Sequence, residues 1–139
     1  IFLPLFEIGD IAADGAVWAG SVRFSVFDPD AEHVPGEVWR ITGDGGEPII
    51  ENVHHCNGVG FSPEGDRVYV SDTRRAVVVS TAIDGSDRRE FTLPTPDGMA
   101  VDTDGFLWIA TYVGGAVVLY CYGDRRGLHS FPTRRSSDL

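Results

Sequence analysis

The sequence predicts an all-β protein, and within that class a partial β-propeller with just under three four-stranded blades. Its main support is a repeat in which Asn57-Gly58 and Asp97-Gly98, forty residues apart (97 − 57), each open a short apolar strand. Eight positions later a turn glycine follows, Gly65 or Gly105, and then a strand that carries an aromatic residue. A repeat of about forty residues built from short strands is typical of a propeller blade. Sustained helical spacing of apolar residues is almost absent, which also favours an all-β chain.

The first blade is expected over residues 7–53. Alternation of apolar residues between Gly, Pro and Asp clusters predicts its strands. They fall near 11–13, 17–21, 37–41 and 48–50. The long connection at 24–35 is expected to be a surface loop, and loops of this length often shape the rim of a pocket.

The second and third blades are expected over 54–93 and 94–127. The second has strands near 57–62, 67–72, 76–82 and 88–93, and the third has strands near 98–102, 106–111 and 115–120. Trp18, Trp39, Trp108 and Tyr69 recur at strand positions and are expected to pack between blades. An open arc of blades leaves terminal strands without partners, which predicts poor solubility of the isolated chain.

The composition restricts the function classes. The 139 residues carry a formal net charge of −10, and the pI is about 4.6. This acidity argues against binding to nucleic acid or to an anionic membrane surface, and it is compatible with a cation site. No apolar run reaches the roughly twenty residues that a membrane helix needs. Cys56 and Cys121 lack the spacing of a metal finger or a disulfide framework, so a reducing cytoplasm is the expected compartment.

Both ends of the sequence differ from a natural domain boundary. The chain starts at Ile1 without an initiator Met, so we expect it to begin inside a longer protein. Residues 128–139 resemble a translated sequencing adapter and are expected to be a non-native, disordered tail. The alternative is a genuine basic, Ser-rich tail that is disordered because it lacks apolar periodicity.

Asn57 and Asp97 are the central candidate site residues. Asn-Gly and Asp-Gly are also strong signals for hairpin turns, so a turn at each position is the alternative. Their matched phase in two blades favours a function, because radial packing would direct both side chains toward one axis. An amide oxygen and a carboxylate suit a hard divalent cation, and the following glycine allows a sharp change of backbone direction.

These blocks, with Tyr69-Val70-Ser71-Asp72-Thr73, Trp108-Ile109-Ala110 and Tyr112–Val117, resemble the senescence marker protein/gluconolactonase/luciferin-regenerating-enzyme family. The resemblance covers about residues 10–120. It implies a six-bladed propeller that holds one divalent metal in its channel and opens sugar lactones or related cyclic esters. By motif match it implies that Asn57 and Asp97 are metal ligands and that Asp97 is also the general base. Calcium, zinc and manganese are not distinguished, and the small-molecule lactone is not identified.

The resemblance is incomplete at the amino end. The family's third ligand is a Glu on a blade that this chain lacks, so we expect the fragment to be inactive alone. The family also has an Arg-x-Asn-Asp motif ahead of the first turn. Counting eight residues back from Gly15 gives Glu7 instead, or Gly9-Asp10 in a slipped register, so Glu7 is a candidate substrate contact.

Antiparallel pairing places the end of each blade's second strand beside the start of its first. Asp72 could therefore orient a metal ligand, or it could equally bond its own turn. Tyr112 could line the substrate pocket or pack within its blade. His54 and His55, just before Asn57, are expected to be solvated rather than ligating.

Two other functions remain open for the same residues. A propeller can be a binding or scaffold module without chemistry, since this fold hosts many unrelated functions. A related hydrolase that acts on other esters or glucosides would differ only in the lining of its pocket. The oligomeric state is not indicated by the sequence.

Overall fold

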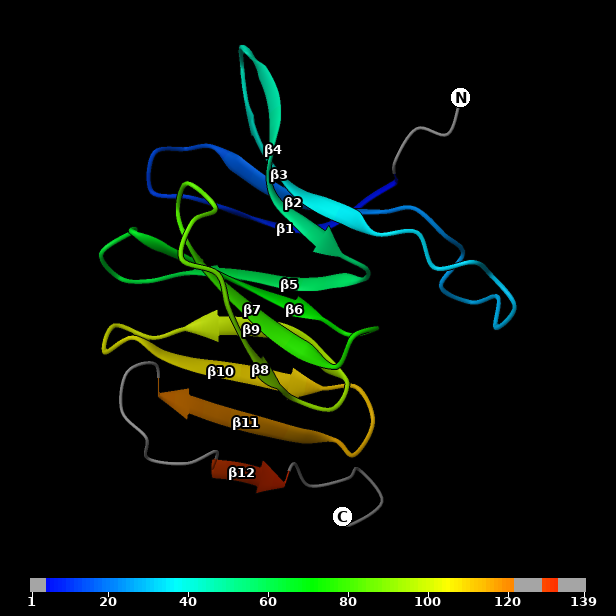
Figure 1. The fold of residues 1–139 in the computed structure, drawn as a ribbon. Coiled ribbons are helices and arrows are strands. Elements are labelled where there is room, and N and C mark those ends of the chain that lie inside the picture. The colour runs from blue at the N-terminus through cyan, green and yellow to red at the C-terminus, as the bar shows by residue number, and fades with distance from the viewer. Residues whose placement is uncertain (1–4, 122–128, 133–139) are drawn as a thin grey trace.

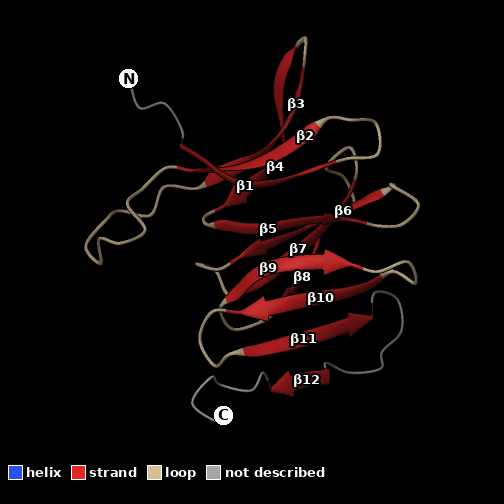
Figure 2. Cartoon of the chain, turned by 180° about the vertical axis from the view of Figure 1, so that it is seen from behind, coloured by secondary structure: helices blue, strands red, loops and turns tan. Residues whose placement is uncertain are grey.

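A computed structural model describes residues 5–121 and 129–132 of the chain, with side chains described over 9–119. Every regular element in these ranges is a β-strand, and no helix among them is long and apolar enough to cross a membrane (Figure 2). The strands form three four-stranded antiparallel sheets, each in chain order (Figure 1). The prediction of an all-β chain built from four-stranded units is confirmed.

The first sheet contains β1 (Leu5–Ile11), β2 (Val17–Val22), β3 (Gly36–Thr42) and β4 (Gly45–Val53). The second contains β5 (Cys56–Phe61), β6 (Arg67–Asp72), β7 (Val77–Ala82) and β8 (Arg89–Thr92). The third contains β9 (Pro96–Val101), β10 (Phe106–Thr111), β11 (Ala116–Cys121) and β12 (His129–Pro132).

The first strand of the first sheet lies earlier than predicted. β1 covers Leu5–Ile11, whereas the sequence placed this strand near 11–13. The amide of Gly15 donates to the carbonyl of Ala12 at 2.8 Å, and the amide of Ala12 donates to the carbonyl of Ala16 at 2.9 Å. These bonds commit Ala12 and its neighbours to the turn, in which Gly15 has a φ of 83° that favours glycine.

The last strand comes from the segment that was expected to be disordered. β12 pairs antiparallel with β11, with Ala116 opposite Pro132 and Leu119 opposite His129. The backbone of residues 129–132 is therefore ordered as the fourth strand of the third sheet. That the segment 128–139 is non-native stays a prediction.

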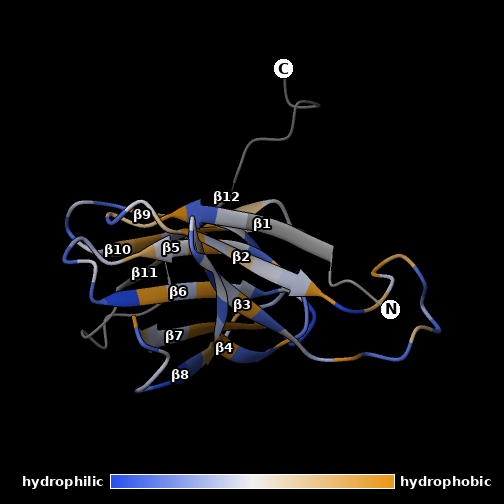
Figure 3. Cartoon of the chain, turned by 90° about the horizontal axis from the view of Figure 1, so that it is seen from above, coloured by the Kyte–Doolittle hydropathy of each residue, from blue (hydrophilic) through white to orange (hydrophobic). Residues whose placement is uncertain are grey.

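The hydrophobic core consists of two layers, one on each face of the middle sheet. Between the first and second sheets lie buried side chains that include Trp18, Val38 and Val70, and between the second and third lie Tyr69, Leu107 and Ile109. Strands β6 and β7 are therefore buried along almost their whole length, as expected for a sheet covered on both faces. Viewed from above, hydrophobic residues follow the strands, whereas the connections are mostly hydrophilic (Figure 3).

The innermost strands β1, β5 and β9 lie next to one another. Each contains a register shift at the same place: between Phe6 and Gly9, between Cys56 and Gly58, and between Pro96 and Met99. In each case one extra residue on the inner strand has no partner on the second strand, which is a β-bulge. Bulges commonly lie beside active sites, where they redirect a side chain.

Candidate functional site

The three bulges coincide with the polar positions that the sequence singled out. Glu7, Asn57 and Asp97 each lie inside a bulge and each precede a turn glycine by eight residues. Asn57 and Asp97 are within strands β5 and β9, so the alternative that they form hairpin turns is wrong. Glu7 lies in β1, but its side chain is outside the described residues.

Direct backbone packing brings the second and third bulges together. A Cβ added at Gly58 would lie 2.8 Å from the carbonyl oxygen of Asp97 and 3.0 Å from the amide nitrogen of Met99. Only glycine allows two strands to approach this closely. The glycine after Asn57 thus serves the contact between sheets and places Asn57 beside the bulge of Asp97.

Asn57 is fixed by a hydrogen-bond chain that crosses between the sheets. Its Nδ2 donates to Oγ1 of Thr73 at 2.8 Å, and this hydroxyl donates to the carbonyl of Pro96 in a short contact. The prediction that the end of the second strand lies beside Asn57 is confirmed by this bond. Because the amide nitrogen is committed to Thr73, the amide oxygen of Asn57 is oriented away from that contact and can coordinate a cation.

Asp97 is half-buried, and within the described chain no hydrogen bond or ion pair reaches its carboxylate. Over the same described residues, no group of three or more His, Cys, Asp or Glu side chains gathers into a cluster. A cation held here by described residues would therefore have one carboxylate and one amide as its protein donors. Two donors leave most of the roughly 6–8 positions of a calcium ion open, and about half of the four positions of a zinc ion.

A cavity of about 560 Å³ opens beside Asn57. Its described lining comes from the second and third sheets with their connections and from the long loop of the first sheet: Val26, Phe27, His55, Asn57, Thr73, Arg74, Thr95 and Tyr112. Asp97 is not among these residues. Tyr112 is 74 % exposed, so the alternative that it packs within its blade is wrong, and it lies where a ligand beside Asn57 could meet it.

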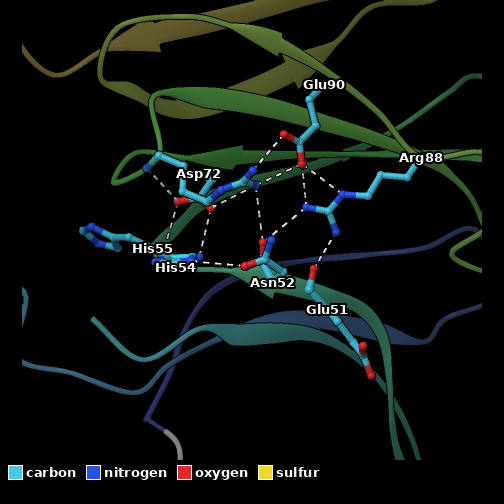
Figure 4. A network of polar contacts seen from close by, with 8 residues as sticks. Glu51, Asn52, His54, His55, Asp72, Arg88 and Glu90 are labelled. Atoms are coloured by element: carbon cyan, nitrogen blue, oxygen red, sulfur yellow. Dashed lines mark hydrogen bonds and ion pairs between the residues drawn. The ribbon is translucent and has the colours of Figure 1, made fainter. Parts of the chain in front are cut away.

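Asp72 is fully buried and accepts hydrogen bonds from backbone amides. Its Oδ2 accepts from the amide of His54 at 2.9 Å, and its Oδ1 accepts from His55 at 3.1 Å and from Arg75 at 3.3 Å (Figure 4). None of these bonds goes to Asn57. Asp72 instead fixes the connection between β4 and β5, which carries His55 to the cavity and leads directly into Asn57.

An ionic network extends from this connection to the outer strand β8. Arg75 donates two hydrogen bonds to the Glu90 carboxylate, both at 2.9 Å, and Arg88 donates to the same carboxylate at 2.7 Å (Figure 4). Arg88 also donates to the carbonyls of Glu51 and Asn52, which joins the second sheet to the first. The hydrogen bonds from Arg75, with a smaller contribution from Arg88, hold the pKa of Glu90 below its ordinary value.

Sequence reasoning missed several residues of this site. Thr73 was named as part of a family motif and was given no role, and Phe27 and Arg74 were not singled out. Only their positions carried a signal, because Thr73 and Arg74 directly follow the second strand and Phe27 lies in the long loop. His55 was expected to be solvated, and it lines the cavity.

Together, the adjacent four-stranded sheets and their bulged inner strands define a β-propeller protein, with a candidate site where the inner strands carry oxygen-bearing side chains. The sequence profile of the SMP-30/gluconolactonase/LRE-like region matches residues 8–137. The chain belongs to this family, as its motifs indicate.

The chain is similar to proteins of known class. It is 31 % identical to the pentonolactonase XacC of Haloferax volcanii, over 96 % of this chain and 48 % of that protein. It superposes on a gluconolactonase from Xanthomonas campestris with a TM-score of 0.74 and 31 % identity, covering 94 % of this chain and 48 % of the other. Regucalcin from Agrobacterium tumefaciens shares the fold with a TM-score of 0.68 and 20 % identity, over 88 % of this chain and 44 % of the other.

These matches confirm the propeller prediction. They also show that the chain spans about half the length of the relatives it matches. The three sheets therefore correspond to part of a ring.

Proposed function

We propose that this chain is the part of a sugar-lactone hydrolase that supplies the general base and two ligands of a divalent metal. The observation that carries the proposal is the placement of Asn57 and Asp97 in equivalent bulges of adjacent inner strands. Membership of a family that contains a pentonolactonase and a gluconolactonase supports the lactone as substrate class.

The residues fit a divalent cation by their donor chemistry. The Asp97 carboxylate has no described protein partner, and the Asn57 amide nitrogen is committed to Thr73, which leaves an oxygen for a ligand. Carboxylate and amide oxygens suit calcium, and carboxylates also suit zinc and manganese. Regucalcin, which shares this fold, is a calcium-binding protein. When bound, the metal would act as a Lewis acid toward the lactone carbonyl.

Asp97 is the group that takes a proton from the water that attacks the ester carbon, and it returns this proton to the ring oxygen that is released when the acyl C–O bond of the lactone breaks. Its carboxylate is half-buried and unneutralised by any described cation, so it keeps an acceptor for this proton. Asn57 would hold the metal through an oxygen without adding a second negative charge, which would leave the metal more electrophilic. The sugar occupies the cavity beside Asn57, and Tyr112 lies at its wall.

The test uses a complete propeller that contains these three sheets, with Asp97→Ala, Asn57→Ala and, as a matched control, Asp104→Ala. Asp104 is an exposed turn carboxylate of the same sheet. Acid release from a pentono- or gluconolactone is followed in a pH-stat, and calcium, zinc and manganese binding is followed by calorimetry. We expect Asp97→Ala to lower kcat at least a hundredfold, since general base catalysis contributes about 10²–10⁴. Asn57→Ala should weaken metal binding, and Asp104→Ala should change neither quantity.

Metal-dependent turnover retained in Asp97→Ala would refute the role of Asp97. Failure of the unaltered protein to bind any of the three metals would instead favour a binding or scaffold propeller without chemistry.

A further inference from the structure

The cavity beside Asn57 contains a positive charge that no carboxylate of the described side chains neutralises. The structure describes seven arginines. Six of them, Arg23, Arg40, Arg67, Arg75, Arg88 and Arg89, form ion pairs with Asp or Glu at distances of 2.7 to 2.9 Å. The seventh, Arg74, lines the cavity and is without such a pair among the described residues.

The contacts of Arg74 hold its guanidinium in place without neutralising it. Its Nε donates to Nδ1 of His33 at 3.3 Å, and its terminal nitrogen makes a short contact with the other ring nitrogen. His33 lies in the long loop of the first sheet and packs against Phe24, with ring centroids 4.9 Å apart. The same loop contributes Val26 and Phe27 to the cavity.

The remaining lining makes this charge unusual. The other described lining residues are apolar, hydroxyl, amide or imidazole groups, and none is a carboxylate. In a chain of net charge −10, an arginine is readily matched by an acidic neighbour, as the other six are. Guanidinium presents a planar set of donors that fits carboxylate and phosphate oxygens. An arginine kept free of acidic partners at a cavity wall is suited to an anionic ligand.

We propose that Arg74 binds an anionic substituent, carboxylate or phosphate, on the sugar lactone, and so selects acidic lactones over neutral ones. The inference rests on the proposed function and narrows its substrate class from sugar lactones to acidic sugar lactones. Arg74 directly follows Thr73, whose hydroxyl holds Asn57. Asn57 and the exposed Arg74 line the same cavity, so a lactone with its ester at Asn57 has Arg74 within the same binding space.

Steady-state kinetics of a complete propeller that contains these sheets test this directly. The substrates are a neutral aldonolactone, the same lactone with a terminal phosphate and the same lactone with a terminal carboxylate. We expect Arg74→Gln to raise KM for the acidic lactone about tenfold to a hundredfold, the factor that corresponds to a lost hydrogen bond to a charged group. KM for the neutral lactone and kcat for all three lactones should stay unchanged. Arg74→Lys should recover part of the affinity.

Arg89→Gln is the matched control, because Arg89 is an exposed arginine of the second sheet that pairs with Asp87 outside the cavity. It should leave every KM unchanged. The phosphate and carboxylate substrates show which anion the site prefers. Equal loss for neutral and acidic lactones in Arg74→Gln, or no preference for acidic lactones in the unaltered protein, would overturn the proposal.

Direct binding separates this inference from the proposed function. If no lactone is opened, the hydrolase proposal fails, and calorimetry with the ring-opened phosphorylated acid and diacid then decides the role of Arg74. Binding that weakens tenfold or more in Arg74→Gln supports the anion site. Binding that is absent, or equal in both proteins, overturns it.

Discussion

Gly58 and Gly98 occupy the same place in two consecutive inner strands but differ in their surroundings. A Cβ at Gly58 would meet the backbone of Asp97 and Met99, whereas a Cβ at Gly98 would meet no described atom within 4 Å. The glycine of the repeated Asx-Gly motif is therefore required for close packing at Gly58 but not at Gly98. The difference concerns backbone atoms, which cannot rotate away as a flexible side chain can.

Gly58→Ala is expected to destabilise the fold by about 1–3 kcal/mol, because overpacking against backbone forces the two inner strands apart. Gly98→Ala is expected to change stability by less than about 0.5 kcal/mol, as ordinary surface substitutions do. Urea unfolding of the two variants measures the difference. Equal effects would contradict the close approach of β5 and β9.

At the scale of the element, the connection between β4 and β5 depends on one buried carboxylate. Asp72→Asn replaces an acceptor with an NH₂ group that faces the backbone donors of His54, His55 and Arg75. We expect a loss of about 1–3 kcal/mol, the cost of leaving a buried polar group unsatisfied. Hydrogen exchange should show faster opening at the amides of His54 and His55.

The exposed turn residue Asp104 provides the control for this substitution. Asp104→Asn should leave both the unfolding free energy and the exchange rates near those of the unaltered chain. Slow exchange that persists at His54 and His55 in Asp72→Asn would show that Asp72 is not what fixes this connection.

The outer strand β8 gives the fold a defined response to acid. Hydrogen bonds from Arg75 lower the pKa of Glu90 from its ordinary value of 4.5, so the ionised form stabilises the folded state. This contribution is fully present above pH 4.5 and is lost as the pH falls through the lower folded-state pKa. Glu90→Gln should therefore reduce stability by about 1 kcal/mol near neutral pH, as expected for an exposed, screened ionic contact, and weaken its dependence on acid pH.

Thermal unfolding measured from about pH 7 down to about pH 3, a range that includes the titration of carboxylates, tests this effect. Glu64→Gln, at an exposed turn, is the matched control. If the melting temperature of Glu90→Gln changed with pH in parallel with that of the unaltered chain, Glu90 would be excluded as a source of the acid sensitivity.

At the scale of the molecule, the described residues cover the middle sheet on both faces and each outer sheet on one. In β10, Leu107 and Ile109 are fully buried against the second sheet, whereas Trp108 on the opposite face is 38 % exposed. Strand alternation places Phe106 and Ala110 on that same face. An exposed apolar face of this kind favours association with other chains.

The isolated chain is therefore expected to associate as its concentration rises, and Trp108→Arg should reduce this association. Phe27→Arg is the control, because Phe27 is 95 % exposed but lies in the long loop of the first sheet rather than in β10. Sedimentation velocity at several concentrations measures the effect. A monomer at every concentration would contradict the expectation.

The sequence predicted most of the fold because strands of this chain alternate between turn glycines that recur at a fixed spacing. The candidate site was predicted at Asn57 and Asp97 by the phase of that repeat. The bulges and the contact at Gly58 could not be predicted, because they depend on how two sheets pack rather than on either strand alone. The Arg74–His33 contact joins residues that lie 41 positions apart, and no local pattern reports it.

The recurring bulge has a consequence for how such sites diversify. Each inner strand has one extra residue at an equivalent backbone position, and Glu7, Asn57 and Asp97 lie at these three positions. Exchanging one of these residues changes the hardness and charge of a donor while the path of the strand is preserved. Under the proposed function, a single substitution at one of these positions would therefore alter which cation or reactant is taken up, without any remodelling of the scaffold.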